Sequence, residues 1–130
     1  MSKSGAAIPH LGFPAIDADH QAFYALLEKV GEAGDDFPVL FAELLAATEK
    51  HFSYENSLMD RYGLGARDEH QAEHRRLLNE FTQINRRVAR GLHPLGRAYV
   101  RERLPQWFVQ HLGGLDSALV ADLKQRQIQE

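Results

Sequence analysis

Histidine and carboxylate side chains occur in this sequence at spacings that suit a metal centre in a helical protein. The segment HFSYE places His51 four residues before Glu55, and the segment HQAEH places His70 four residues before His74. Side chains four residues apart lie on one face of a helix, about one turn from each other. Each segment therefore predicts a pair of ligands on one helix face, a pattern from which helix bundles build metal sites.

Two further segments add histidines and an aspartate to this pattern. His20 lies in IDADHQ, and HLGGLD places His111 five residues before Asp116. Five residues rotate an ideal helix so far that these two side chains would point roughly 140° apart. We therefore predict an inserted residue of the π-bulge kind between them, which would bring both side chains onto one face.

The segment around His111 conflicts with regular helix formation at three positions. Pro105 lacks a backbone N–H and is expected to kink the helix or divide it in two. Gly113 and Gly114 each cost about 1 kcal/mol relative to alanine in a helix interior. We expect these glycines to lower the steric cost of the π insertion and to leave room for the backbone close to the cluster. Such concentrated local conflict is more typical of a site than of plain scaffold.

Apolar residues at spacings of three and four define four helical stripes that would position the polar groups. Sustained alternation with a period of two, which would indicate strands, is absent from the sequence. The connections between stripes are short, and short connections make neighbouring helices antiparallel. The sequence therefore predicts an all-α fold, an up-down-up-down four-helix bundle. The bundle is expected to cover residues 16–130 and to follow an irregular N-terminal arm of residues 1–15.

The apolar stripes carry five histidines and Glu55, and the π insertion would add Asp116. A single histidine on an apolar face is usually a packed core or boundary residue. An unpaired buried carboxylate, however, costs several kcal/mol, and a domain of this size is stable by only about 5–15 kcal/mol. Metal ions would satisfy all these groups at once. His10 and His93 fall in predicted loops and are interpreted as surface residues.

The composition fits one domain of a soluble protein. The chain has 130 residues, of which 44% are hydrophobic and 25% are charged, and it has no cysteine. The lack of cysteine excludes disulfides and thiolate ligands. No apolar run approaches the roughly 20 residues of a membrane span, and the first residues make a poor signal peptide. We therefore expect a cytoplasmic protein without a membrane partner.

Charge is distributed unevenly, although the net charge is only −3. Residues 17–69 have a net charge of −8, and residues 75–103 have a net charge of +6. One explanation is a basic patch for an acidic partner. We favour the other, in which two halves of the bundle meet across solvated salt bridges. No aromatic interleaving or nucleic-acid motif accompanies the arginines, so we expect no nucleic-acid partner.

Taken together, the polar segments resemble the hemerythrin signature in order and in local spacing. The resemblance covers about residues 10–122, and IDADHQ and WFVQH also look like flanking segments of that family. It implies a centre of two iron ions (Fe2+/Fe3+) with an oxo or hydroxo bridge. The metal ligands that it implies are His20, His51, Glu55, His70, His74, His111 and Asp116.

The resemblance also implies a role for each of these ligands. His70, His74 and His111 would hold the first iron, and His20 and His51 would hold the second. Glu55 and Asp116 would bridge the two ions, and the ligand count leaves one position of the second iron free. The implied function is reversible dioxygen binding by a carrier, a store or a sensor. By position, the wall of the dioxygen pocket would consist of Phe52, Trp107, Phe108 and Leu112.

Two other classes of function stay open on the sequence alone. The same centre could belong to a di-iron enzyme that acts on peroxide, nitric oxide or ferrous iron. We expect no enzyme, because no obvious base or charged substrate clamp accompanies the ligands. A zinc-stabilised scaffold is the third reading, but zinc usually takes four ligands. As a sensor, the chain would need a separate protein partner, and we expect a monomer or a weak homo-oligomer.

Overall fold

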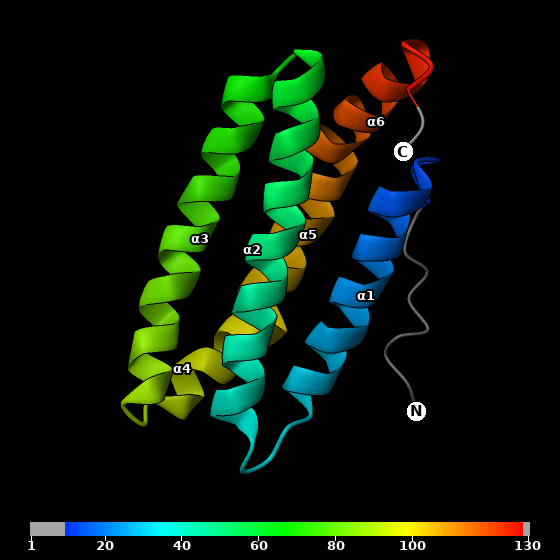
Figure 1. Ribbon diagram of the computed structural model, residues 1–130. Helices are drawn as coiled ribbons and strands as arrows, with labels where there is room; N and C mark the ends of the chain where they lie inside the picture. The colour runs from blue at the N-terminus through cyan, green and yellow to red at the C-terminus, as the bar shows by residue number, and fades with distance from the viewer. Residues whose placement is uncertain (1–9, 129–130) are drawn as a thin grey trace.

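The computed structural model describes residues 10–128 and shows helices that run antiparallel to one another (Figure 1). Three arms of the bundle are α1 (Pro14–Gly31), α2 (Phe37–Tyr62) and α3 (Arg67–Ala89). The fourth arm comprises α4 (His93–Ala98), η2 (Tyr99–Arg103), α5 (Leu104–His111), η3 (Leu112–Asp116) and α6 (Ser117–Gln125). The predicted all-α four-helix bundle is therefore confirmed, and the described part of the chain contains no strand.

Prolines begin several of these helices, and a glycine ends one of them. Pro14, Pro38 and Pro94 lie in the first turns of α1, α2 and α4, where a missing N–H leaves no hydrogen bond unmade. Helix α2 ends at Gly63, whose φ of 59° is left-handed and costs glycine little. The sequence analysis predicted an irregular N-terminal segment of residues 1–15. Residues 14 and 15 are instead helical, because α1 begins at Pro14, and residues 1–9 lie outside the described chain.

Pro105 neither ends nor divides the fourth arm. It lies in the first turn of α5, directly after the π-helical segment η2. Ala98 and Leu104, which flank η2, both have right-handed helical dihedral angles. A proline inside an α-helix clashes with the carbonyl of the residue four positions earlier. The wider π turn before Pro105 accommodates this conflict, and the arm stays helical throughout.

The apolar core consists of two clusters that lie on either side of a polar layer. On α1, Ile16 belongs to one cluster and Phe23 to the other, and His20 lies between them. The fourth arm repeats this order, with Phe108 in the cluster of Phe23 and Leu119 in the cluster of Ile16. Each fully buried leucine or phenylalanine contributes about 1.5–3 kcal/mol. The two clusters thus offset the cost of burying polar groups between them.

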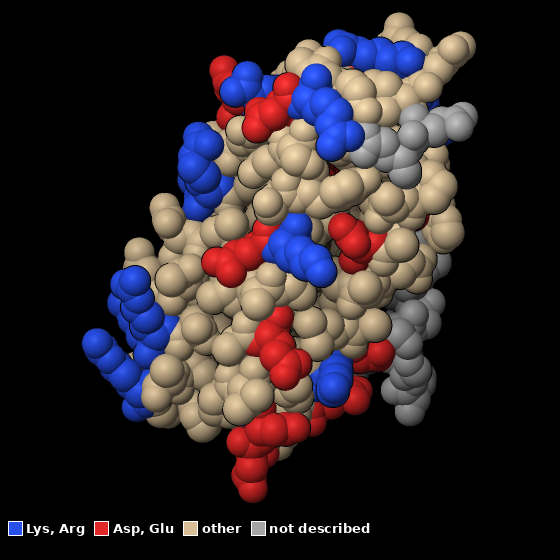
Figure 2. Space-filling view, viewed as in Figure 1, with Lys and Arg blue, Asp and Glu red and all other residues tan. Residues whose placement is uncertain are grey.

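On the face shown in Figure 2, two regions of the surface carry mainly one sign of charge, while acidic and basic side chains mix elsewhere. Figure 2 shows acidic residues gathered at the end where α1 meets α2, and basic residues along the edge formed by α3. Arg97 links the basic segment 75–103 to the acidic segment 17–69. Its guanidinium donates to the carbonyl oxygens of Ala33 (2.7 Å) and Gly34 (3.2 Å). Arg103 pairs instead with Glu80 within the basic segment. Across residues 10–128, no helix combines the length and apolarity needed to cross a membrane.

Candidate metal centre

Seven polar side chains from all four arms converge in the middle of the bundle. None of them is more than 5% exposed to solvent. The arms contribute His20 from α1, His51 and Glu55 from α2, His70 and His74 from α3, and His111 and Asp116 from the fourth arm. Every residue that the sequence predicts as a metal ligand is thus brought into one cluster.

The donor atoms of the cluster form two groups that share both carboxylates. One group contains Glu55 and Asp116 with His70, His74 and His111, and the other contains the same carboxylates with His20 and His51. Within each group, one donor atom per residue lies within 4.8 Å of all the others. Such an arrangement suits two neighbouring cations with two shared ligands.

The π-helical segment η3 brings His111 and Asp116 to the same site. It spans Leu112–Asp116, so the predicted insertion between the two ligands is confirmed. Nε2 of His111 lies 3.1 Å from Oδ1 of Asp116. Ser117 supports the widened turn, because its hydroxyl donates to the carbonyl oxygen of Leu112 at 2.8 Å.

The structure contradicts one of the two effects that the sequence analysis expects of the glycines of η3. Gly113 and Gly114 are both exposed, and a Cβ atom added at either position would meet no atom within 4 Å. Neither residue has a left-handed φ that would favour glycine. The expectation that they leave room beside the cluster is therefore wrong, because both positions face away from it.

Inside the cluster, the carboxylate oxygens lie close to imidazole nitrogens without the geometry of hydrogen bonds. The carboxylate oxygens of Asp116 lie 3.1 Å from Nε2 of His20 and of His70. The oxygens of Glu55 lie 3.1 Å from Nε2 of His51 and 3.3 Å from Nε2 of His74. Nevertheless, no residue in the described range 10–128 is a hydrogen-bond partner of the four carboxylate oxygens, of either ring nitrogen of His20 or of Nε2 of His51. Buried polar atoms are almost always hydrogen-bonded, so donor atoms aimed at common points fit ligands arranged around cations.

The surrounding imidazoles keep both carboxylates ionised. Burial alone would raise the pKa of Glu55, but the charge of His51 and close contacts with His20 and His51 hold it well below its usual range. Burial and the charge of Glu55 would also raise the pKa of Asp116. Contacts with His111, His20 and His70 outweigh these effects and lower the pKa of Asp116 to about 2. Two ionised carboxylates in a buried layer favour bound cations.

The carboxylates in turn raise the pKa values of three imidazoles, those of His20, His51 and His70, against the effect of burial. Burial lowers the pKa of His51, but the charge of Glu55 and the contact with Asp19 outweigh it and raise this pKa to about 10. For His70, contacts with Asp116 and Glu55 likewise outweigh burial and raise the pKa to about 9. Protons and cations compete for the same nitrogen atoms, so cation binding to these imidazoles releases protons.

Two aromatic residues of the predicted pocket wall stack on histidines of the larger group. Phe52 lies parallel to His74, with ring centres 3.9 Å apart and an interplanar angle of 5°. Trp107 stacks on His111 at 4.3 Å and 16°. These contacts restrict the rotation of both imidazole rings and cover one face of each.

The other two predicted wall residues, Phe108 and Leu112, are buried at 1% and 5% exposure. Phe108 stacks at 3.9 Å on Phe23, which the sequence analysis did not single out. Phe23 lies three residues after His20 and on the same helix face, so this spacing was an available signal.

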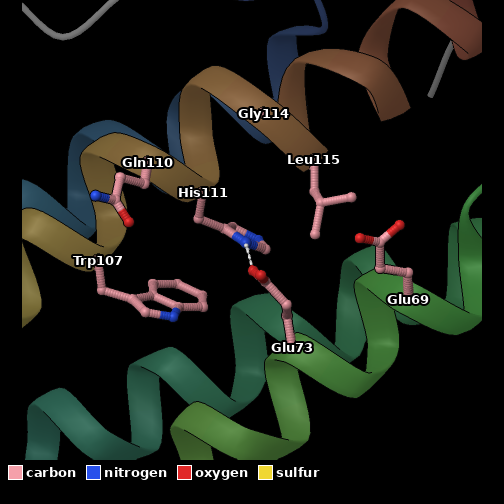
Figure 3. Close-up of a pocket in the computed structure, with 7 residues that line it drawn as sticks. All are labelled: Glu69, Glu73, Trp107, Gln110, His111, Gly114 and Leu115. Carbon is pink, nitrogen blue, oxygen red and sulfur yellow. Dashed lines mark hydrogen bonds and ion pairs between the residues drawn. The ribbon is translucent and has the colours of Figure 1, made fainter.

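Polar side chains outside the cluster contact the outer nitrogens of three histidines. They are Asp19, Asn56 and Glu73, and the sequence analysis did not identify them. Each is the immediate neighbour of a ligand in the sequence, which is the only signal that could have found them. Glu73 reaches His111 beside a surface pocket of about 240 Å³, as Figure 3 shows. The pocket is lined by Glu69, Glu73, Trp107, Gln110, His111, Gly114 and Leu115.

Comparison with known proteins places this cluster in a family context. Residues 11–123 match the model of the family described as the hemerythrin HHE cation binding domain. The chain is 39% identical over 118 residues to Bacteriohemerythrin of Ralstonia nicotianae (strain ATCC BAA-1114 / GMI1000), which covers 90% of this chain and 85% of that protein. It is 26% identical over 106 residues to Myohemerythrin of Riftia pachyptila, with 82% and 81% coverage. No solved structure matches the chain significantly.

Proposed function

The chain belongs to the hemerythrin family, and from this premise we propose that its seven clustered side chains hold two iron ions at which dioxygen binds reversibly. In this proposal the protein is a carrier, a store or a sensor of dioxygen rather than an enzyme. Two iron ions with an oxo or hydroxo bridge would supply the two electrons that dioxygen takes up on binding and returns on release.

The two groups of donor atoms support a specific division of the ligands. His70, His74 and His111 would hold one iron, and His20 and His51 would hold the other. Glu55 and Asp116 would bridge the ions, because both carboxylates belong to both groups. The ion with two imidazoles has fewer protein ligands, so the free position for dioxygen is on that side of the cluster.

The observation that carries this proposal is the set of buried donor atoms without hydrogen-bond partners. Seven such atoms, including all four carboxylate oxygens, lie in one layer of the bundle. Leaving a buried polar group unsatisfied costs about 1–3 kcal/mol, and more for a charged group. Several such costs would remove a large part of the stability of a domain of this size, whereas two cations would satisfy all of these atoms except Nδ1 of His20, which is the ring nitrogen opposite the one that faces the carboxylates. A zinc scaffold fits less well, since zinc usually takes four ligands.

The ligand types favour reversible binding over the oxidation of a substrate. Five neutral imidazoles and only two carboxylates surround the ions, and imidazole suits iron in several oxidation states. Few anionic ligands stabilise the ferric state less than a carboxylate-rich site would.

The residues around the cluster keep water and anions out of it. Phe52 and Phe108 are each only 1% exposed, and Leu112 is 5% exposed. Trp107 covers the face of His111. Exclusion of water strengthens every electrostatic interaction inside the site and leaves no competing solvent ligand for the free position.

The proposal is tested by loading the metal-free chain with Fe2+ under anaerobic conditions. We expect about two irons per chain by the ligand count and a visible absorption band that appears in air and disappears on deoxygenation. The variant His20→Ala should lose iron and the reversible band. His10→Ala, whose side chain is 72% exposed, is the matched control and should keep both.

Three outcomes would overturn the proposal. One metal per chain, or zinc alone after ferrous loading, would reject the di-iron assignment. Irreversible oxidation in air would reject reversible binding. Steady turnover of peroxide, nitric oxide or ferrous iron, faster than slow autoxidation, would assign the centre to an enzyme.

A further inference from the structure

We propose that Asp19, Asn56 and Glu73 are positioning residues that fix the tautomer and the orientation of three metal-binding histidines. The inference rests on the proposed function for the identity of the metal. The three hydrogen bonds themselves join side chains of this chain and do not depend on which metal binds.

Each contact joins a side chain on one arm to a histidine on the next. Nδ1 of His51 on α2 donates to Oδ2 of Asp19 on α1 at 3.0 Å. The second contact runs from Nδ1 of His74 on α3 to Oδ1 of Asn56 on α2, at 2.9 Å. The third runs from Nδ1 of His111 on the fourth arm to Oε1 of Glu73 on α3, at 3.0 Å. The three contacts thus follow the chain from arm to arm around the bundle.

A carboxylate at Nδ1 determines which ring nitrogen carries the hydrogen. An ionised carboxylate only accepts hydrogen bonds, so Nδ1 of His51 and of His111 must donate. In a neutral imidazole, Nε2 then has a free lone pair and no hydrogen. Nε2 of both histidines points into the cluster, where metal ligation needs such a lone pair.

Nε2 of His111 lies among ring nitrogens of α3 and a carboxylate oxygen of Asp116. Nε2 lies 3.1 Å from Nε2 of His70 and 3.2 Å from Nε2 of His74. Oδ1 of Asp116, which also carries a lone pair, lies at 3.1 Å. With the hydrogen of His111 held outward by Glu73, its Nε2 can accept a hydrogen bond from either of these histidines in the metal-free chain, and the same lone pair is available to a cation that takes the place of that hydrogen.

Each group of ligands has one histidine that contacts an outer carboxylate, Asp19 or Glu73. Asp19 contacts His51 in the smaller group, and Glu73 contacts His111 in the larger group. An outer carboxylate raises the basicity of the imidazole that it contacts and strengthens its bond to a metal. Each ion would therefore have one strengthened histidine, while the neutral Asn56 orients His74 without adding charge.

His111 is held by a ring contact as well as by Glu73. Its ring stacks on Trp107, and Figure 3 shows Glu73 meeting the edge of the same ring from α3. The side chain of Glu73 is 34% exposed and that of Asp19 is 43% exposed. Both can therefore be replaced without opening a cavity in the core.

Within residues 10–128, no side chain of the fourth arm makes the corresponding hydrogen bond to His20 on α1. Nδ1 of His20 is buried and lacks a hydrogen-bond partner within residues 10–128. His20 is consequently the least restrained of the ligands that stand beside the proposed free position.

Substitution of Glu73 tests the inference, and Glu69→Ala is the matched control. Glu69 lies one turn earlier on α3 and lines the same pocket. In the metal-free protein at pH 8, nitrogen NMR should show the Nδ1–H tautomer of His111 in the parent and in Glu69→Ala. Glu73→Ala should lose this preference. Glu73→Gln should keep it, because an amide oxygen also accepts a hydrogen bond.

The second measurement is the rate at which the iron-loaded protein loses metal to a chelator. We expect Glu73→Ala and Asp19→Ala to lose iron 10- to 100-fold faster than the parent, by analogy with other outer ligands. Glu69→Ala should stay within about twofold of the parent, since it removes an equal charge without contacting a histidine.

The two measurements separate this inference from the proposed function. An unchanged tautomer in Glu73→Ala, or metal loss no faster than in Glu69→Ala, would overturn the inference while the parent still binds iron. A parent that binds no iron would refute the proposed function, and the tautomer measurement would still decide whether Glu73 positions His111. If Glu73→Ala does not fold, Glu73→Gln and Asp19→Asn provide the comparison of metal loss, with a smaller increase expected for each.

Discussion

Nε2 of His111 lies 3.1 Å from Oδ1 of Asp116, although five residues separate them on the same helical arm. A regular α-helix would direct these two side chains apart. The π-helical segment η3 between them supplies the missing rotation. The fourth arm thus provides one imidazole and one carboxylate to the cluster because its backbone departs from α-helical geometry there.

Alanine at either glycine of η3 should stabilise the protein. A Cβ at Gly113 or Gly114 meets no neighbour, and alanine is favoured over glycine in a helix by about 1 kcal/mol. We expect Gly113→Ala and Gly114→Ala each to raise the free energy of unfolding by up to about that amount. Guanidinium unfolding of the metal-free protein measures the change.

Gly96→Ala is the control for these glycine variants. Its Cβ would collide with side chains of Val88 and Phe37, so this variant should be less stable than the parent. A loss of stability in Gly113→Ala or Gly114→Ala would show that η3 needs the flexibility of glycine after all.

Deletion of Gly114 should preserve the cluster. A π-bulge is a single residue inserted into an α-helix, so removing one residue would leave the two ligands four positions apart and on one face. We expect the deletion variant to bind the same amount of iron as the parent, measured by elemental analysis. Deletion of Ala118, which is outside η3, is the comparison and should disrupt the packing of α6. Loss of iron in the first variant alone would contradict the prediction.

Glu55→Gln should abolish stoichiometric iron binding and leave the helices intact. The substitution keeps the shape of a fully buried side chain but removes the charge shared by both groups of ligands. We expect less than about one iron per chain and an unchanged far-ultraviolet circular dichroism spectrum. Glu43→Gln, at an exposed position of the same helix, should behave like the parent. Full iron content in Glu55→Gln would show that this carboxylate is not a bridge.

The stability of the metal-free protein should decrease in both acid and alkali. The pKa values of His51 and His70 are raised from 6.5 to about 10 and about 9. Their stabilising effect is therefore complete below pH 6.5 and is lost as the pH rises through 9 and 10. The pKa of Asp116 is lowered from 3.8 to about 2, so its contribution is present above pH 3.8 and is lost as the pH falls to 2.

Unfolding measured across the pH range checks this expectation. Between pH 6.5 and 10, the metal-free protein should lose more than about 1 kcal/mol of stability. The iron-loaded protein should not show this loss, because bound metal replaces the protons on the imidazoles. Equal pH profiles for the two forms would argue that these histidines do not bind the metal.

The helices and the candidate ligands follow from local spacing, and the sequence predicted them for that reason. The pairs in HFSYE and HQAEH lie on the faces that their spacing of four dictates. The five-residue spacing of His111 and Asp116 required an insertion, and η3 is that insertion. Pro105 was expected to kink or divide the fourth arm, but a π segment directly before it keeps the arm helical.

The tertiary structure decided which side chains surround the ligands. Glu73 contacts a histidine 38 residues away, and Asp19 contacts one 32 residues away. Such contacts depend on the rotation and offset of one packed helix relative to the next, which packing of the whole core sets. The roles of the glycines were misjudged for the same reason, since only the packed arms show that Gly113 and Gly114 face outward. The sequence by itself therefore determined the helices, the candidate ligands and the distortion between two of them, because these depend on spacing along one helix. The outer contacts of the histidines were decided only when separate helices packed together.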